Sequence, residues 1–477
     1  MLFNSLSFAF FLPVVYILYW FVFRKLKQQN ILLLVASYFF YSCWDWRFLF
    51  LLMFSTLLDF YSGLMMQNAG SERIKKIWFW ASIGINLGFL GFFKYYNFFA
   101  ESFAQLLAGF GFEVDIWTLQ IILPVGISFY TFHGLSYVID IYYDRIKAER
   151  NFVDYSVFVS FFPLLVAGPI ERATHLLPQI KRARVFNYAQ SVDGLRQILW
   201  GLFKKVVIAD NCAEYANLIF NDSANQSGST LVMGALFFTF QIYCDFSGYS
   251  DIALGTARLF GIDLLRNFSY PYFSRDIAEF WRRWHISLST WFRDYLYIPL
   301  GGSKGGTWMK VRNTFAIFLV SGFWHGANWT FIAWGLLNAL YFMPLLLTNT
   351  NRNHIGIVAE GRALPSVGEL VSMAGTFMLT VFAWIFFRAE SLTHAFSYIR
   401  GIFNSSLFEL PAFLPKSVLA LIAFFMAIEW IGREKPYALA EVGTRWPSPL
   451  RWSFYYVLII FIILFMGKEQ EFIYFQF

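Results

Sequence analysis

Long apolar runs alternate along the whole chain with short segments rich in Lys and Arg. A helix needs about 17 to 25 apolar residues to cross the hydrocarbon core of a bilayer, and several runs have this length. Charged residues make up only 14% of the chain, against about 25% in an ordinary soluble domain. A soluble core could not bury this much apolar surface. We therefore expect an all-α, polytopic membrane protein.

Several other classes of protein are disfavoured by charge and residue spacing. The 37 Lys and Arg residues exceed the 30 Asp and Glu only modestly and are scattered, which is typical of topology signals and lipid contact rather than of nucleic-acid binding. The three cysteines and six histidines have no disulfide or metal-site spacing, so we expect no bound metal. There is also no P-loop, and no permanently bound cofactor is expected.

The basic segments predict how the chain is threaded. The first run, residues 5–23, has no Lys or Arg before it and three cations directly after it, so the N-terminus is predicted to be extracytoplasmic. With residues 314–347 divided into two helices, about eleven spans are expected. The other spans are predicted at residues 31–42, 48–66, 77–93, 116–139, 231–246, 367–387, 417–431 and 452–466.

Four segments depart from this regular pattern. Residues 157–167 are too short for a span and are predicted to form a re-entrant hairpin. Residues 211–230 contain no Lys or Arg and are predicted to be extracytoplasmic, whereas residues 258–312 carry nine Lys and Arg against four acids and should face the cytoplasm. Residues 314–347 would form a helix of about 50 Å, too long for one straight span. Two helices meeting at residues 322–328 would solve this. We expect one membrane domain over residues 1–477 and no soluble domain.

A histidine inside the longest apolar run is the first functional candidate. His325 lies between Ser321 and Trp329, and an ionisable group at membrane depth is costly unless it is paired or hydrated. If the segment is helical, His325, Asn328 and Trp329 share one face. A buried neutral imidazole is the usual general base near neutral pH. The alternative is a histidine that bonds a carbonyl and only holds helices together.

The segment from Phe280 to Trp291 is predicted to be one amphipathic helix at the membrane interface. His285 would lie at the edge of its apolar face, and Arg282 and Arg283 would point away from it. The alternative to a surface anchor is that these arginines bind phosphates of an anionic cytoplasmic substrate. The residues that would form the apolar face are Trp281, Trp284, Leu288, Trp291 and Phe292.

Two aspartates end another apolar run. Asp245 and Asp251, with Ser247 between them, predict a broken helix, which a membrane tolerates where it is buried in protein or lines a wet cavity. A role in capping helix ends and a direct role in catalysis remain open. No G-x-S-x-G motif is present, so serine hydrolase chemistry is disfavoured.

Seven segments between residues 123 and 389 together resemble the membrane-bound O-acyltransferase family, and within it the alginate O-acetylase type. They occur in the order that the family shows. The segments are LPVGISFYTF (123–132), FP…AGP (162–169), DFSGYSD (245–251), FWRRWHISLSTW (280–291), YIPLGG (297–302), GFWHGANW (322–329) and WIFFRA (384–389).

This resemblance implies a multi-helix bundle around a central tunnel that an acyl thioester enters from the cytoplasm. His325 matches the catalytic histidine of the family, and His285 matches its second signature polar position. We assign donor binding to Arg282, Arg283, Trp284 and Asn328. His133 stands where relatives would have glutamine, and its role is open. We assign a structural or tunnel-lining role to Asp245, Ser247, Asp251 and Trp324.

The family also implies partners. Its members act with extracytoplasmic proteins that esterify a polysaccharide such as alginate, cellulose or peptidoglycan, so a partner acetyltransferase is expected in addition to membrane lipids. The chain is then predicted to be an O-acetyltransferase of the bacterial inner membrane. It would take acetyl from a cytoplasmic thioester, acetyl-CoA or an acylated carrier protein, and pass it to polysaccharide hydroxyls directly or through the partner. In that reaction His325 would be the general base or carry the acyl group, and His285 would orient the thioester or bond its oxyanion. A secondary transporter or flippase is the alternative, and so is a structural scaffold.

Overall fold

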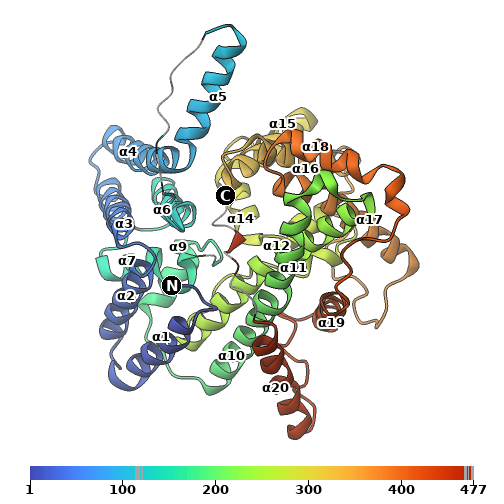
Figure 1. Cartoon of the computed structure of the whole chain (residues 1–477). Helices are drawn as coiled ribbons and strands as arrows, with labels where there is room; N and C mark the ends of the chain where they lie inside the picture. The colour runs from blue at the N-terminus through green and yellow to red at the C-terminus, as the bar shows by residue number, and fades with distance from the viewer. Residues whose placement is uncertain (113–118, 120–121, 167, 467–469, 471, 474–477) are drawn as a thin grey trace. The chain divides into compact units, whose positions relative to one another are not determined.

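A computed structural model describes residues 1–112, 119, 122–166, 168–466, 470 and 472–473, and all regular structure in these residues is helical (Figure 1). The predicted all-α membrane fold is confirmed, while the count of about eleven spans and the central tunnel stay predictions. Two shorter helices, Leu6–Val22 and Ser448–Leu464, are also apolar. The described helices that are long and apolar enough to span a membrane are Trp46–Gln67, Glu72–Gly109, Gly228–Leu259, Trp329–Leu347 and Val367–Arg388.

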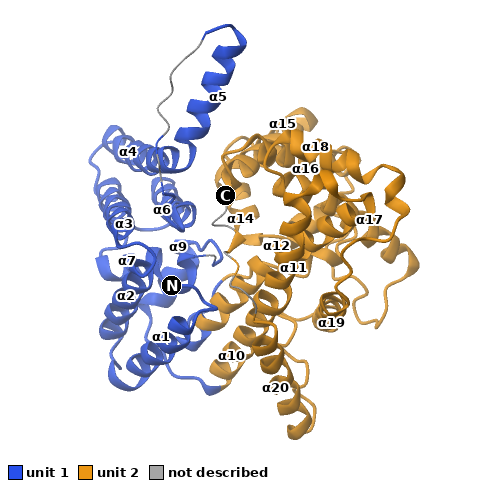
Figure 2. Cartoon of the chain, viewed as in Figure 1, with its two compact units in different colours: residues 1–188, 257–264 blue, residues 189–256, 265–477 orange. Residues whose placement is uncertain are grey.

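The chain divides into two compact units, coloured separately in Figure 2. Unit 1 comprises Met1–Tyr188 and Ala257–Leu264, and unit 2 comprises Ala189–Thr256 and Leu265–Phe477. Every candidate site residue named above except His133 belongs to unit 2. The single domain over residues 1–477 stays a prediction.

Unit 1 is built around α3, which packs against both α4 and α6. The buried Asp59 of α3 accepts hydrogen bonds from Ser82 Oγ (2.6 Å) and Asn86 Nδ2 (2.7 Å) of α4, so a carboxyl in an apolar helix has partners. The helices of this unit are α1 (Leu6–Ile17), α2 (Leu26–Ser42), α3 (Trp46–Gln67), α4 (Glu72–Leu90), α5 (Tyr96–Gly109), α6 (Ile127–Tyr142), α7 (Phe152–Ser160), α8 (Phe162–Leu165) and α9 (Ala173–Lys181), with π-helical turns η1 (Leu18–Val22) and η2 (Gly91–Tyr95).

Two predicted segments of unit 1 take a different form. The span predicted at residues 116–139 corresponds to α6, which begins only at Ile127; residues 116–118 and 120–121 lie outside the described residues. Residues 157–167, predicted to form a re-entrant hairpin, comprise the end of α7 and the short helix α8, both largely buried, with residue 167 outside the described part. Their re-entry into the membrane stays a prediction.

Unit 2 carries the remaining helices, and α15 and α16 pack along each other. Its elements are α10 (Tyr188–Leu202), η3 (Phe203–Ala209), α11 (Asp210–Asn221), η4 (Ser223–Asn225), α12 (Gly228–Leu259), η5 (Pro271–Phe273), α13 (Ile277–Arg283), α14 (Ile286–Phe292), η6 (Arg293–Tyr297), α15 (Gly306–His325), α16 (Trp329–Leu347), α17 (Val367–Arg388), α18 (Leu392–Ile402), η7 (Ser405–Phe408), α19 (Lys416–Gly432) and α20 (Ser448–Leu464).

Helix α12 is continuous, so the helix break predicted around the two aspartates is wrong. Two consecutive lysines of η3, Lys204 and Lys205, contact the polar side chains of α12. Lys204 Nζ lies 2.5 Å from Asp251 Oδ2 and donates to Ser247 Oγ at 3.0 Å, and Lys205 Nζ lies 2.8 Å from Asp245 Oδ1. Because partners on another element satisfy these groups, the backbone of α12 does not have to open.

The single amphipathic helix predicted from Phe280 to Trp291 is also wrong. The chain forms α13 and α14 and changes direction at His285, whose φ of 43° lies in the left-handed region. A left-handed residue cannot continue an α-helix. The break turns His285 inward, where 1% of the residue is exposed.

The break predicted within residues 314–347 is confirmed. Helix α15 ends at His325, and α16 begins at Trp329 after Asn328 caps its first turn. The expectation that His325, Asn328 and Trp329 share one helical face is therefore wrong, because the helix ends between them. The two helices touch through backbone, since a Cβ on Gly322 would lie 2.3 Å from the carbonyl oxygen of Phe331.

Candidate active site

His325 is held by aromatic rings at the C-terminal end of α15. It is 5% exposed. Its ring centroid lies 4.9 Å from that of Trp324, 5.1 Å from that of Trp334 on α16 and 5.2 Å from that of Phe387 on α17. All three pairs are edge-to-face, the favoured geometry for aromatic rings. The imidazole is thus oriented by three neighbours from three elements.

His285 lies at the junction of α13 and α14, outside the five candidate spans. Its Nδ1 is 3.1 Å from Asn267 Oδ1, and its ring packs edge-on against Phe246 at 4.7 Å. Burial lowers the pKa of His285 from 6.5 to about 3. The side chain is therefore neutral at physiological pH.

Trp324 joins the two histidines. Its ring centroid lies 4.9 Å from His325 and 6.1 Å from His285, so the structure brings together three of the predicted site residues. Trp284 belongs to the same aromatic cluster, because it lies 5.0 Å from Trp384, which stacks at 5.7 Å on Trp334. These rings surround the two imidazoles with apolar surface.

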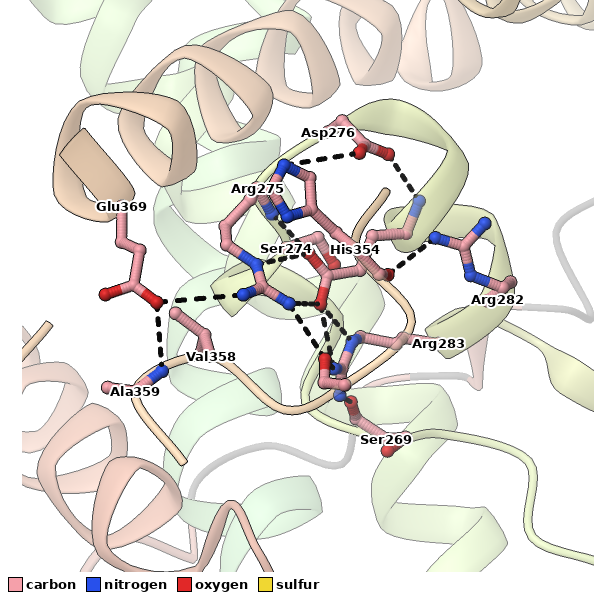
Figure 3. A network of polar contacts seen from close by, with 12 residues as sticks. Ser269, Ser274, Arg275, Asp276, Arg282, Arg283, His354, Val358, Ala359 and Glu369 are labelled. Carbon is pink, nitrogen blue, oxygen red and sulfur yellow. Dashed lines mark hydrogen bonds and ion pairs between the residues drawn. The ribbon is translucent and has the colours of Figure 1, made fainter. Parts of the chain in front are cut away.

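The two predicted phosphate-binding arginines contact a loop, residues 348–366 between α16 and α17 (Figure 3). Arg282 donates to the carbonyl oxygens of Asn351 and His354, both at 2.8 Å. Arg283 donates to Glu279 Oε1 at 2.8 Å and to the carbonyl oxygen of Gly356 at 2.9 Å. The guanidinium of Arg283 is thus engaged by a carboxylate of its own helix. Donor binding by these residues stays a prediction.

A cavity of about 610 Å³ adjoins α13, α15 and α16 and carries cationic side chains. Trp281 lines it and lies 5.6 Å from Trp334, which contacts His325. Ser321 also lines it, one helical turn before His325. We call this the basic cavity, after its four cations Arg282, Arg293, Lys310 and Arg352.

A second cavity, of about 600 Å³, lies beyond the end of α15. Phe387 lines it and contacts the His325 ring. Arg388 donates to Asn217 Oδ1 at 2.8 Å and to Asn221 Oδ1 at 3.1 Å on its wall. We call this the asparagine cavity, after Asn217, Asn221 and Asn328. His325 therefore lies next to a ring that borders this cavity and one turn from a serine that borders the basic one.

Asn328 has a structural role and also lines the asparagine cavity. Its Oδ1 accepts a hydrogen bond from the Thr330 backbone N–H at 3.0 Å, and its Nδ2 donates to the Glu390 carbonyl at 2.9 Å. Three residues of α12 were predicted to be structural: Asp245, Ser247 and Asp251. They contact Lys204 and Lys205, as described above. Donor binding by Asn328 and a tunnel-lining role for Asp245, Ser247 and Asp251 stay predictions.

Several residues of the site were not singled out from the sequence. Trp334 and Phe387 occur in apolar helices, where an aromatic residue is no signal. Asn267 lies in a stretch without helical or strand periodicity, and only the rarity of buried asparagine could have drawn attention to it. His133, in unit 1, is buried in α6, and its Nε2 accepts a hydrogen bond from the Glu171 backbone N–H at 3.1 Å.

Comparison with known proteins identifies the family of the chain. A model of the membrane-bound O-acyltransferase family matches residues 142–383. The chain is 39% identical over 412 residues to a probable alginate O-acetylase of Pseudomonas aeruginosa, covering 86% of this chain and 76% of the relative. It is 36% identical over 501 residues to the probable alginate O-acetylase of Pseudomonas putida, covering 100% of both. It is 37% identical over 432 residues to the peptidoglycan O-acetyltransferase of Helicobacter pylori, covering 84% and 80%. With two buried histidines in one aromatic cluster and these relatives over most of its length, the chain belongs to the membrane-bound O-acyltransferase family and is a membrane O-acyltransferase.

Proposed function

We propose that this chain transfers an acetyl group from a cytoplasmic thioester, acetyl-CoA, to hydroxyls of an extracytoplasmic polysaccharide. The observation that carries the proposal is the position of His325 between two cavities of different character. One cavity is lined by four cations and the other by asparagines. A base placed close to two cavities suits a reaction between two substrates held in different compartments.

The basic cavity is proposed to receive the donor. Coenzyme A carries phosphates, which Arg and Lys recognise by charge and hydrogen bonding. Three of its four cations, Arg282, Arg293 and Lys310, come from residues 258–312, the segment predicted to be cytoplasmic. This charge pattern supports entry of the donor from the cytoplasm. An acylated carrier protein would bring a phosphate-linked thioester to the same surface and is the alternative donor.

The asparagine cavity is proposed to receive the acceptor. Amide side chains donate and accept hydrogen bonds and a guanidinium donates them, which is what sugar hydroxyls require. Asn217 and Asn221 belong to residues 211–230, predicted to be extracytoplasmic. The names of the relatives support a polysaccharide acceptor such as alginate or peptidoglycan. A separate extracytoplasmic acetyltransferase that completes the transfer, and a location in the bacterial inner membrane, are part of the proposal.

The chemistry follows from a neutral imidazole. His325 takes the proton of the attacking hydroxyl as its oxygen bonds to the thioester carbonyl carbon. The carbon–sulfur bond then breaks, and the thiolate takes up the proton. Such general base catalysis contributes about 10²- to 10⁴-fold to the rate. The alternative is an acyl-His325 intermediate, which would divide the transfer into two steps.

The test uses purified protein in nanodiscs with radiolabelled acetyl-CoA. Wild type is compared with His325→Gln, and with His175→Gln as a matched loss of a histidine from unit 1. We expect thioester consumption to fall about 10²- to 10⁴-fold in His325→Gln and to persist in His175→Gln, with both variants folded by size-exclusion chromatography. Protein-bound label in wild type would favour the acyl-His325 route. Equal turnover in all three proteins would contradict the proposal, and a wild type that moves substrate across the membrane without consuming thioester would favour a transporter.

A further inference from the structure

Asn267 contacts the ring of His285 and holds the two residues that directly follow it. Asn267 is fully buried, with 0% of the residue exposed. Its Oδ1 accepts hydrogen bonds from the Ser287 backbone N–H at 3.3 Å and from Ser287 Oγ at 2.9 Å, and its backbone carbonyl accepts from the Ile286 N–H at 2.9 Å. The same Oδ1 lies 3.1 Å from His285 Nδ1.

These contacts determine which nitrogen of His285 carries the proton. A backbone N–H can only donate, so the atom of Asn267 that faces Ser287 must be the amide oxygen and not the amide nitrogen. The amide oxygen can only accept, so His285 Nδ1 must donate to it. In a neutral imidazole the other nitrogen, Nε2, then carries a lone pair and no proton.

We propose that Asn267 is a positioning residue that holds His285 in the neutral tautomer with its proton on Nδ1, so that Nε2 acts as a hydrogen-bond acceptor in the acyl transfer. The inference rests on the proposed function and assigns the part of His285 in it. An imidazole in this state cannot donate from Nε2 to an oxyanion. It can instead accept a hydrogen bond from the attacking hydroxyl or from the released thiol.

The left-handed backbone at His285 turns the chain so that the residues after it reach Asn267. With φ at 43° the residue cannot continue α13, and Asn267 bonds the two residues that follow the turn. One residue, through its backbone carbonyl and its side-chain oxygen, therefore holds both the segment after the turn and the ring. Loss of the amide oxygen would remove the acceptor that faces His285 Nδ1, so the preference for the tautomer with its proton on Nδ1 should weaken.

The charges near Asn267 provide a second variant. Asn267 lines a small cavity of about 20 Å³ with two cations, Lys204 and Arg266, and two acids, Asp251 and Glu429. Lys204 is already paired with Asp251. In Asn267→Asp the new carboxylate could still accept hydrogen bonds from His285 and Ser287, and its negative charge would be attracted by the cations of this cavity. A carboxylate next to an imidazole raises the pKa of the imidazole, so this variant should keep the tautomer and become protonated at higher pH.

The experiment is ¹⁵N NMR of histidine-labelled full-length protein in nanodiscs, with the His285 signals identified by their loss in His285→Gln. We expect a protonated Nδ1 and an unprotonated Nε2 in wild type, a mixture of tautomers in Asn267→Leu, and the wild-type tautomer with protonation shifted to higher pH in Asn267→Asp. Ser287→Ala is the control, because it removes one donor to Asn267 and leaves the contact with His285. A protonated Nε2 in wild type would overturn the inference, and so would an unchanged tautomer in Asn267→Leu.

Acetyl transfer by the same samples separates this inference from the proposed function. We expect kcat to fall on the order of 10- to 100-fold in Asn267→Leu, as for other residues that orient a histidine, with the KM for acetyl-CoA unchanged and most activity kept in Asn267→Asp. If wild type shows the expected NMR spectra but no acetyl transfer, the proposed function is contradicted and the tautomer assignment still holds. If Asn267→Leu does not fold, the shift in Asn267→Asp decides: its absence overturns the inference.

Discussion

At the scale of single residues, the site depends on two imidazoles buried among aromatic rings. His325 is enclosed by Trp324, Trp334 and Phe387, and His285 by Phe246 and Trp324. An apolar shell disfavours the charged form of a histidine. Burial lowers the pKa of His285 and so keeps this side chain available as an acceptor at neutral pH, at a cost in stability when the pH falls.

Acidification should destabilise the protein through His285. Burial lowers the pKa of His285 to about 3, below the ordinary value of about 6.5. Between these two values the unfolded chain binds a proton that the folded chain does not, so stability falls as pH falls below about 6.5. The loss is up to about 1.4 kcal/mol for each pH unit.

The measurement is the free energy of unfolding in detergent at pH 7 and pH 5, for wild type and His285→Gln. Because glutamine does not titrate in this range, the variant should lose less stability between the two pH values than wild type does. The same loss in both proteins would show that other groups account for the acid sensitivity.

The identity of the two histidines could be predicted from the sequence, but their surroundings could not. His325 stands out because a titratable residue occurs in an apolar run, and His285 because it belongs to a recognisable motif. Asn267 lies 18 residues before His285 and meets it only because the chain turns at Tyr270 and again at His285, both with positive φ. Left-handed turns at Tyr and His have no sequence signal comparable to that of glycine.

At the scale of helices, α15 and α16 form a hairpin whose closeness positions His325. Gly322 of α15 and Gly335 of α16 face the partner backbone, and a Cβ on either would lie 2.3 Å from a carbonyl oxygen. The run of residues 314–347 predicted this hairpin from its length alone. By contrast, α12 was predicted to break because two aspartates end its apolar run, and their partners Lys204 and Lys205 come from an element about forty residues earlier. Local patterns do not report such distant pairs.

Gly322→Ala should force the two helices apart and displace His325. We expect a loss of about 1–3 kcal/mol in stability, the usual cost of overpacking, together with a drop in kcat. Gly375→Ala in α17 is the matched control, since a Cβ there would meet no atom within 4 Å, and it should be neutral or slightly stabilising. Thermal unfolding and acetyl transfer are measured on both. If the two variants lost equal stability and activity, close packing of α15 and α16 could not be the cause of the loss in Gly322→Ala.

At the scale of the whole molecule, the distribution of cations predicts which loops face which compartment. Residues 211–230 lack Lys and Arg, and residues 258–312 are rich in them. The positive-inside rule therefore places the first segment outside and the second in the cytoplasm. The two segments contribute to the walls of the asparagine cavity and the basic cavity, respectively.

Cysteine labelling in spheroplasts tests this topology. Asn225→Cys and Lys304→Cys place single thiols at exposed positions of the two segments, in a Cys43→Ser background because Cys43 is exposed while Cys212 and Cys244 are buried. A membrane-impermeant maleimide should label the first variant directly and the second only after permeabilisation. The background protein without a new cysteine is the blank, and the reverse pattern of labelling would invert the predicted topology.

Within the described residues, no side chain lines both the basic cavity and the asparagine cavity. The histidine between them contacts rings rather than either cavity's polar groups. Substitutions in one wall can therefore accumulate without altering the other. Under the proposed function, a lineage built on this plan can exchange one polymer for another while inheriting its acyl donor unchanged, and an engineer can redesign acceptor choice by changing the asparagine wall alone.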